Sequence, residues 1–288
     1  MEASPIRNRL QLAVTALLFS TGGAAIKAAT LTGWQIASFR SAVAAVVIVA
    51  ALPESRRGWS WRLVPIAAAY AATLVLFVLA TRLTTAANAI FLQSTAPLYV
   101  LLLAPWLLHE SIRPRDLLYM LLLLGGIILF FIGTEQPVAT APDPRGGNLL
   151  GLASGLAWAL TVTGLRWLGR RSDTENGAIA AVALGNVMAL VAALPLAFPV
   201  RAGGGFNLIV ILYLGVAQIG LAYIFLTRAI RYVPAFEATA VLLLEPVMNP
   251  IWAWLVHGER PGPWALVGGA IILSATLVNT WRLKTGKI

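Results

Sequence analysis

The chain has 288 residues, of which 59% are apolar and only 11% are charged, against about 25% charged in a typical soluble domain. This deficit of charge excludes a solvated globule, a disordered chain and a nucleic-acid-binding domain. The net charge of +10 does not alter that conclusion, because the charged residues lie in short gaps between apolar runs and form no continuous basic face. The absence of cysteine excludes disulfides, thiolate zinc sites and iron–sulfur clusters.

Ten apolar runs are each long enough to cross a bilayer as a helix, which takes about 20 residues. Runs such as Leu117–Phe131 do not alternate between apolar and polar residues, as the strands of a transmembrane β-barrel would. We therefore expect an all-α polytopic membrane protein with no room for a soluble domain. The expected spans are residues 10–29, 33–52, 62–82, 86–107, 116–134, 147–167, 177–197, 207–228, 236–256 and 264–281.

The first span begins like a signal peptide, with Arg7 and Arg9 before an apolar run. A cleaved signal has an apolar core of about 7–15 residues. Here the apolar run continues to Leu31 and only Lys27 interrupts it, so we expect a retained helix.

Lysine and arginine residues near the span ends gather on one side of the membrane, fifteen against four. Because cytoplasmic loops carry the excess of these residues, we expect both termini in the cytoplasm and the protein in a bacterial-type inner membrane. The fifteen are Arg7, Arg9, Arg56, Arg57, Arg62, Arg113, Arg115, Arg166, Arg170, Arg171, Arg228, Arg231, Arg282, Lys284 and Lys287, and the four are Arg82, Arg145, Arg201 and Arg260.

An internal repeat relates the fourth span to the ninth. The segment from Arg82 to Glu110 can be laid on the segment from Arg231 to Glu259 with a constant offset of 149 residues. The matched identities include a proline and a glutamate in register, which favours a repeat over chance. The identical pairs are Arg82 with Arg231, Ala86 with Ala235, Ala89 with Ala238, Pro97 with Pro246, and Glu110 with Glu259.

The repeat predicts two halves of five helices each. Since five is odd, the second half must enter the membrane in the opposite sense, and inverted repeats of this kind are typical of secondary transporters. The expected halves are residues 1–134 and 147–288, joined by the proline-containing loop 135–146.

Several motifs resemble those of the drug/metabolite transporter superfamily of the EamA type. They are Lys27 in the first span, Phe39-Arg40 in the second, Pro97 before His109-Glu110, Pro246 before Gly258-Glu259, and Gly268-Gly269 in the last span. His109 stands where the family usually has glycine. The resemblance implies ten helices in two inverted halves around a central cavity. Within the superfamily the chain is most similar to aromatic amino-acid exporters of the YddG type, which implies the direction of transport.

Polar and aromatic side chains recur at helical spacing within four spans, as in Tyr70, Thr73 and Phe77 on one face of the third. Such faces either bond and pack against neighbouring helices or line a cavity, and the residues alone leave both interpretations open. The candidate substrate-binding residues are Tyr70, Phe77, Asn88, Tyr99, Trp158, Gln218 and Tyr223.

The ninth span holds the most informative group. Glu245 is a carboxylate at mid-membrane, which is costly, so we consider it a candidate coupling residue that loads a proton. The alternative is a neutral or ion-paired side chain that holds helices together. Pro97, Pro246 and Pro250 are expected to kink their helices and act as hinges.

Lys27 and Arg40 are expected a few residues inside the outer boundary, where long side chains can reach water. Either could attract a substrate carboxylate, although for Arg40 we favour a structural role. His109 and His257 adjoin acidic turns on opposite sides of the membrane, so they cannot share one metal, and no metal or cofactor is expected.

An enzyme and a passive channel are the competing classes. The chain lacks an HExxH motif, a nucleophile elbow and an aspartate pair, and the repeat favours a carrier over a channel. The predicted function is export of small amphiphilic metabolites, above all aromatic amino acids, by alternating access, with a carrier of lipophilic cations and other drugs or metabolites as the alternative. The expected partners are a small-molecule substrate and membrane lipids, with no nucleic acid, and the expected state is a monomer.

Overall fold

The computed structural model describes residues 5–107, 114–132, 136–169, 177–200, 204–229, 232–233 and 235–285. Within these ranges the named elements are all helical. Nine helices are long and apolar enough to cross a membrane, and the shorter apolar helix Asp116–Ile132 brings the total in the described ranges to ten. The prediction of an all-α polytopic membrane protein is confirmed.

The observed helices follow the expected spans closely, usually within three residues at each end. Four of the spans consist of consecutive helical pieces. In chain order the elements are α1 (Pro5–Ser20), α2 (Gly22–Ala28), α3 (Gly33–Ala51), the short η1 (Pro53–Arg56), α4 (Leu63–Leu83), α5 (Ala86–Gln93), α6 (Ala96–Leu107), α7 (Pro114–Ile132), α8 (Pro144–Gly169), α9 (Gly177–Ala197), α10 (Gly205–Leu212), the π-helical η2 (Tyr213–Leu221), α11 (Ala222–Ala229), α12 (Ala235–Leu242), α13 (Leu244–His257) and α14 (Pro263–Thr285).

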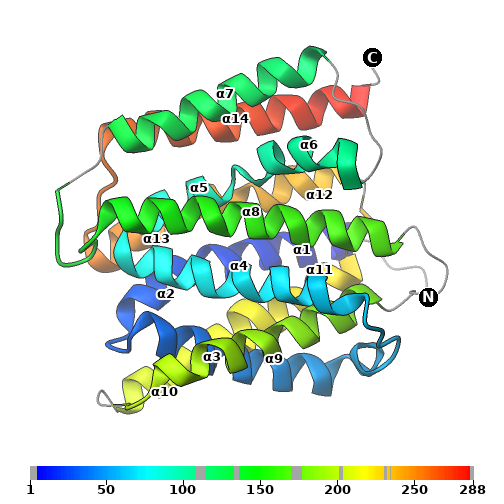
Figure 1. Ribbon diagram of the computed structural model, residues 1–288, viewed down its shortest axis with the longest axis vertical. Helices are drawn as coiled ribbons and strands as arrows, with labels where there is room; N and C mark the ends of the chain where they lie inside the picture. Colours follow the sequence, from blue (N-terminus) through cyan, green and yellow to red (C-terminus); the bar gives the residue numbers. More distant parts are fainter. Residues whose placement is uncertain are drawn as a thin grey trace.

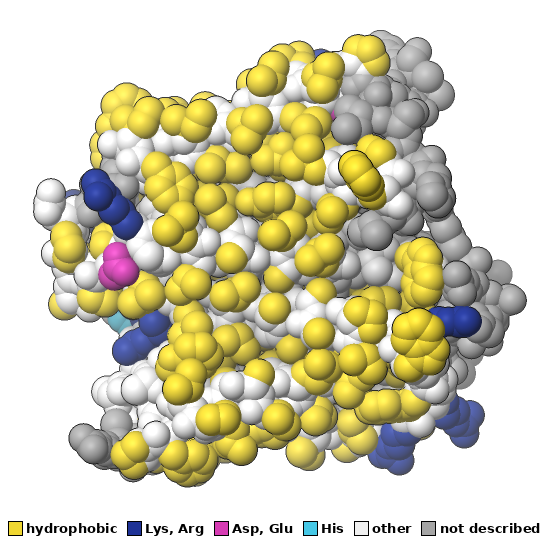
Figure 2. Space-filling model, in the orientation of Figure 1, with side chains coloured by type: hydrophobic (Ala, Val, Ile, Leu, Met, Phe, Trp, Pro, Cys, Tyr) yellow, Lys and Arg dark blue, Asp and Glu magenta, His cyan; other side chains and the backbone are white. Residues whose placement is uncertain are grey.

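The helices form a bundle in which α1 begins and α14 ends at the same end (Figure 1). We name the two ends by charged residues of the first span. Arg9 lies near the start of α1 and marks the Arg9 end, whereas Lys27 lies near the end of α2 and marks the Lys27 end. The visible face carries hydrophobic side chains across its middle and charged side chains towards the two ends, as a membrane-spanning protein requires (Figure 2).

Two helices are broken at equivalent places. The fourth span breaks between α5 and α6 and the ninth between α12 and α13, and α5 and α12 differ by 149 residues at both ends (235 − 86 and 242 − 93). Pro97 and Pro246 each follow directly after the break, where the missing N–H of proline removes a helical hydrogen bond. Pro250, by contrast, lies within the continuous helix α13.

The break in the fourth span leaves carbonyl oxygens that α8 covers. A Cβ atom added to Gly155 of α8 would lie 3.0 Å from the carbonyl oxygen of Leu92 and 3.1 Å from that of Gln93. Gly155 therefore allows α8 to approach the broken backbone closely, as small residues do between membrane helices.

The helix after the connection between the predicted halves begins earlier than expected, because α8 begins at Pro144 and not after residue 146. Asp143 Oδ1 accepts a hydrogen bond of 3.0 Å from the Gly146 N–H, and proline suits the first position of a helix, since its missing N–H would have no partner there. The prediction of a loop over 135–146 is therefore wrong at its C-terminal end.

Helices α7 and α14 lie side by side at one edge of the bundle (Figure 1). Their contact depends on glycine: a Cβ atom on Gly126 would lie 2.8 Å from Cγ1 of Ile272 and 3.0 Å from the carbonyl oxygen of Gly268. The neighbouring Gly125 has nothing within 4 Å of the same position. Two adjacent glycines of one helix thus differ only in what they face.

We expect Gly126→Val to destabilise the protein by about 1–3 kcal/mol, because an overpacked helix contact must move apart. Gly125→Val changes the same helix equally and is the matched control, with little effect expected. Thermal unfolding of the two purified variants in one detergent checks this, and equal losses would contradict the proposed contact.

Candidate functional site

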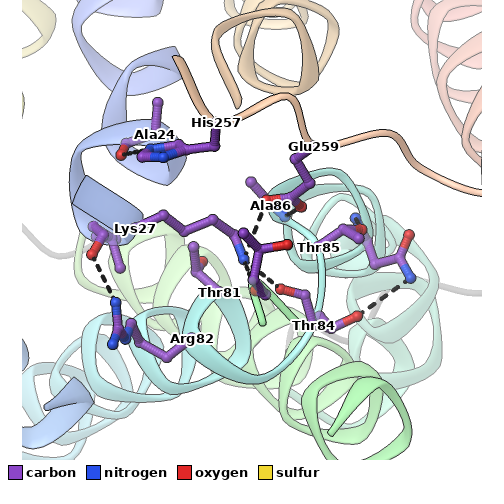
Figure 3. A network of polar contacts seen from close by, with 12 residues as sticks. Ala24, Lys27, Thr81, Arg82, Thr84, Thr85, Ala86, His257 and Glu259 are labelled. Carbon is purple, nitrogen blue, oxygen red and sulfur yellow. Dashed lines mark hydrogen bonds and ion pairs between the residues drawn. The ribbon is translucent and has the colours of Figure 1, made fainter. Parts of the chain in front are cut away.

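A buried ion pair joins distant parts of the chain at the Lys27 end. Lys27 Nζ lies 3.2 Å from Glu259 Oε2, and the two side chains are 4% and 3% exposed. Lys27 also donates to the carbonyl oxygens of Thr84 and Thr140. Glu259 in turn accepts a hydrogen bond from the N–H of Ala86, the first residue of α5, where the helix dipole favours a negative charge. Figure 3 shows the two charged side chains pointing toward each other.

Further hydrogen bonds extend this contact, which we call the Lys27 network. Arg82 Nη1 donates to the carbonyl oxygens of Ile26 and Ala29, and the ring of His257 lies 2.8 Å from the carbonyl oxygen of Ala24 (Figure 3). The Lys27 network thus ties α2 and the α4–α5 corner to the end of α13. It connects segments from the two predicted halves.

Asn88, a predicted substrate-binding residue, belongs to this end of the bundle. Its Nδ2 donates to Thr84 Oγ1 and to Asn148 Oδ1, both at 3.3 Å, and Asn148 Nδ2 donates to the carbonyl oxygen of Phe130. The structure therefore separates Asn88 from the tyrosines of the central cluster described next.

A second polar cluster lies in the middle of the bundle around Arg40. The side chain of Arg40 on α3 is 1% exposed, and its Nη2 donates a 3.0 Å hydrogen bond to the carbonyl oxygen of Leu74 on α4. Its guanidinium lies within electrostatic range of the hydroxyls of Tyr70 and Tyr223. The expectation that Arg40 reaches water is wrong, because helices α4, α9 and η2 pack against α3 and enclose the side chain. Lys27 is likewise enclosed.

Two of the predicted binding residues meet in this central cluster. The rings of Tyr70 and Tyr223 contact edge to face, with centroids 5.6 Å apart, and Tyr223 makes a similar contact with Phe19 at 5.4 Å. The ring of Tyr70 fits against α9 because residue 185 is glycine, since a Cβ atom there would lie only 2.5 Å from the ring. Three helices, α1, α4 and α11, thereby contribute one aromatic group.

Amide side chains near the centre have polar atoms without partners. Asn186 Oδ1, Gln218 Oε1 and the Tyr70 hydroxyl are buried and make no hydrogen bond in the structure. Asn186 and Tyr223 nevertheless lie close to the Tyr70 hydroxyl. Gln218 sits on the π-helical segment η2, against Gly22 of α2. Buried polar atoms without partners are costly, and π-helical turns occur often at functional sites.

Three other predicted residues lie on α4, α8 and α6. Phe77 is buried two turns beyond Tyr70 on α4. Trp158 of α8 is half-buried against the hydrophobic core. One turn before it, the Ser154 hydroxyl donates to the carbonyl oxygen of Thr73, which places Trp158 near the level of Tyr70. Tyr99 is half-buried on α6 with its hydroxyl beside Thr95, and a role for these three residues stays a prediction.

Glu245 lies on the first turn of α13, directly after the helix break. Its side chain is half-buried and lies within electrostatic range of Tyr223. Asn249, one turn further, is fully buried against Gly23, and neither of its amide atoms has a hydrogen-bond partner. The structure thus brings Glu245 near the tyrosine pair.

The sequence analysis named Arg40 but favoured a structural role for it, and it missed Asn186 as a member of the central cluster. The available signal for Arg40 was a charged residue within a long apolar helix, which usually marks a functional position. For Asn186 the signal was an isolated amide in the otherwise apolar helix α9. In the part of the chain that the structure describes, His, Asp and Glu side chains form no group of three that could hold a metal ion.

We expect Glu259→Gln to destabilise the protein by about 3–5 kcal/mol, because it leaves the Lys27 ammonium buried without its counter-ion. The control is Glu237→Gln, which breaks the exposed pair between Arg9 Nε and Glu237 Oε2 at 2.9 Å and should cost about 0–1 kcal/mol. Denaturant unfolding of both variants measures the difference. A double variant, Lys27→Met with Glu259→Gln, should recover part of the loss, and no recovery would argue against an uncompensated charge as the cause.

Several known proteins resemble this chain in sequence or in fold. The chain is 31% identical to an uncharacterized protein of Pseudomonas aeruginosa, over 96% of this chain and 99% of that one. Over 27% of its length it is 34% identical to the quaternary ammonium compound-resistance protein QacF of Klebsiella aerogenes, 72% of which is covered. A crystal structure sharing 18% identity superposes with a TM-score of 0.63, covering 96% of this chain and 98% of its own, which shows the fold alone.

The sequence profile of the EamA-like transporter family matches residues 9–132 and again residues 145–281. These two matches cover most of the chain. The protein belongs to the EamA-like transporter family of multi-pass membrane proteins.

Proposed function

We propose that this protein is a secondary transporter that exports small amphiphilic metabolites, aromatic amino acids above all, by alternating access. The observation that carries the proposal is the central cluster, in which the edge-to-face pair of Tyr70 and Tyr223 lies beside the amide of Asn186. Aromatic rings stack on an apolar side chain, and hydroxyl and amide groups bond the charged ends of a zwitterion. Membership of a transporter family supports the class of function.

The contrast between the two ends supports alternating access. At the Lys27 end, α5 packs against α13 and the buried Lys27 network ties the predicted halves together. Towards the Arg9 end, on the other side of the two breaks, the two broken spans pack on different helices: α6 packs on α8, whereas α12 packs on α1 and α14. We infer a carrier closed at the Lys27 end. The excess of arginine at the other end supports a cytoplasmic Arg9 end and insertion in the inner membrane.

We propose the halves 1–134 and 147–288 as the two moving units. The equivalent breaks at residues 94–95 and 243 support this division. Pro97 and Pro246, beside those breaks, are the proposed hinges. Hinge motion requires few residues that absorb a backbone change, and a helix break supplies them.

Purified protein in liposomes should exchange labelled phenylalanine or tryptophan for unlabelled amino acid with saturation, because a carrier has a finite number of sites. Replacing both Tyr70 and Tyr223 by alanine should reduce exchange about tenfold or more, given that aromatic contacts contribute 0.5–1.5 kcal/mol each beyond the area they bury. The double alanine variant of Trp158 and Tyr99 tests the periphery of the same site. A panel in which only sugars compete would contradict the proposed substrate.

Glu245 is the proposed coupling group, because it is a carboxylate within electrostatic range of Tyr223. Glu245→Gln keeps the shape of the side chain and removes its proton exchange. We expect uphill amino-acid movement driven by a pH gradient to be lost while exchange at equal pH persists. Flux measured with and without the gradient separates these results, and unchanged gradient-driven flux would exclude this role.

The partial similarity to QacF favours one alternative, a carrier of lipophilic cations. The buried guanidinium of Arg40 opposes a cation in the central cluster. Competition by tetraphenylphosphonium, without competition by amino acids, would support this alternative.

A further inference from the structure

The guanidinium of Arg40 is a buried cation without a counter-ion. Within the part of the chain that the structure describes, ion pairs join Arg9 to Glu237 and Lys27 to Glu259, and none includes Arg40. The side chain is 1% exposed, and its Nε has no hydrogen-bond partner. An isolated charge in an apolar interior is strongly unfavourable, so such groups are normally paired or serve a function.

A purely structural role accounts for only part of this arrangement. The hydrogen bond from Arg40 Nη2 to the carbonyl of Leu74 fastens α3 to α4. A neutral amide could make the same bond without the cost of burying a charge. The positive charge and the unpartnered Nε therefore need another explanation.

The groups near Arg40 have the chemistry to bind an anion. The hydroxyls of Tyr70 and Tyr223 lie within electrostatic range of the guanidinium, and the Tyr70 hydroxyl has no hydrogen-bond partner of its own. A carboxylate accepts several hydrogen bonds at once and prefers the planar fork of arginine. The Tyr70 hydroxyl and the Arg40 fork can both donate to the same carboxylate.

We propose that Arg40 binds the carboxylate of the transported molecule and thereby determines that the carrier selects carboxylate-bearing substrates. This inference rests on the proposed function and deepens it by assigning one end of the substrate. With the carboxylate at Arg40, an apolar side chain lies against the rings of Tyr70, Tyr223 and Phe19. The ammonium group of an amino acid then extends toward Glu245, which is within electrostatic range of Tyr223.

The test compares phenylalanine with one ligand that lacks the charged carboxylate and one that lacks the ammonium group. Competition against labelled phenylalanine is measured in liposomes with unlabelled phenylalanine, phenylalaninamide and 3-phenylpropanoate, and direct binding of the last two to purified protein is measured by calorimetry. We expect phenylalanine to compete about 10- to 100-fold better than its amide, because losing a hydrogen bond to a charged group lowers affinity by about this factor. In Arg40→Gln, which keeps a donor for Leu74, the ratio should fall close to one.

Arg82→Gln is the matched control, since Arg82 also donates to backbone carbonyls of a neighbouring helix but lies in the Lys27 network. It should keep the wild-type ratio. If Arg40→Gln does not fold, Arg40→Lys retains the charge without the planar fork and should lower the ratio without abolishing it. An unchanged ratio in the Arg40 variant that folds would overturn the inference.

The two proposals can fail separately. If phenylalanine is transported and its amide competes equally well, the assignment of Arg40 is wrong and the proposed amino-acid export stands. If amino acids are not transported but 3-phenylpropanoate binds in an Arg40-dependent way, the carboxylate site stands and the substrate class changes. If only tetraphenylphosphonium binds, both are wrong.

Discussion

The buried pair of Lys27 and Glu259 is the interaction on which the arrangement of the bundle depends. Both charges are almost fully enclosed, so each needs the other. Glu259 also accepts from the N–H of Ala86, while Lys27 donates to carbonyls of Thr84 and Thr140. Because these groups come from four separate segments, the pair holds the ends of α2, α5 and α13 together. A change in how the two predicted halves meet would have to break it.

The two polar clusters of the bundle differ in how far they are satisfied. In the Lys27 network nearly every charged or polar group has a partner, which is what a closed contact in an apolar medium requires. In the central cluster Arg40 Nε, the Tyr70 hydroxyl and the Asn186 carbonyl oxygen have none. Unpaired buried groups cost stability, and a polar ligand would remove that cost. This difference supports the proposal that the Lys27 network is a closure and the central cluster a binding site.

Two of the membrane-spanning helices are broken at equivalent places. A helix that stops at residue 93 and resumes at residue 96 exposes carbonyls, and Gly155 lets α8 cover them. The ninth span breaks at the equivalent place, next to Glu245. Breaks at mid-membrane are tolerated only where protein or a cavity satisfies the backbone, and their repetition supports the proposal that the site lies beside them.

The sequence by itself determined the helices and their repeat. Runs of about 20 apolar residues can only be helices in a bilayer, and prolines at equivalent positions already predicted where two of them break. Only the tertiary structure decided which polar residues meet. Asn88 and Tyr70 look alike in sequence, yet one joins the Lys27 network and the other the central cluster. Arg40 was expected to reach water, and packing of α4, α9 and η2 against α3 buried it instead. Helix periodicity specifies a face, whereas the partner of that face depends on how all the helices pack together, which no local pattern encodes.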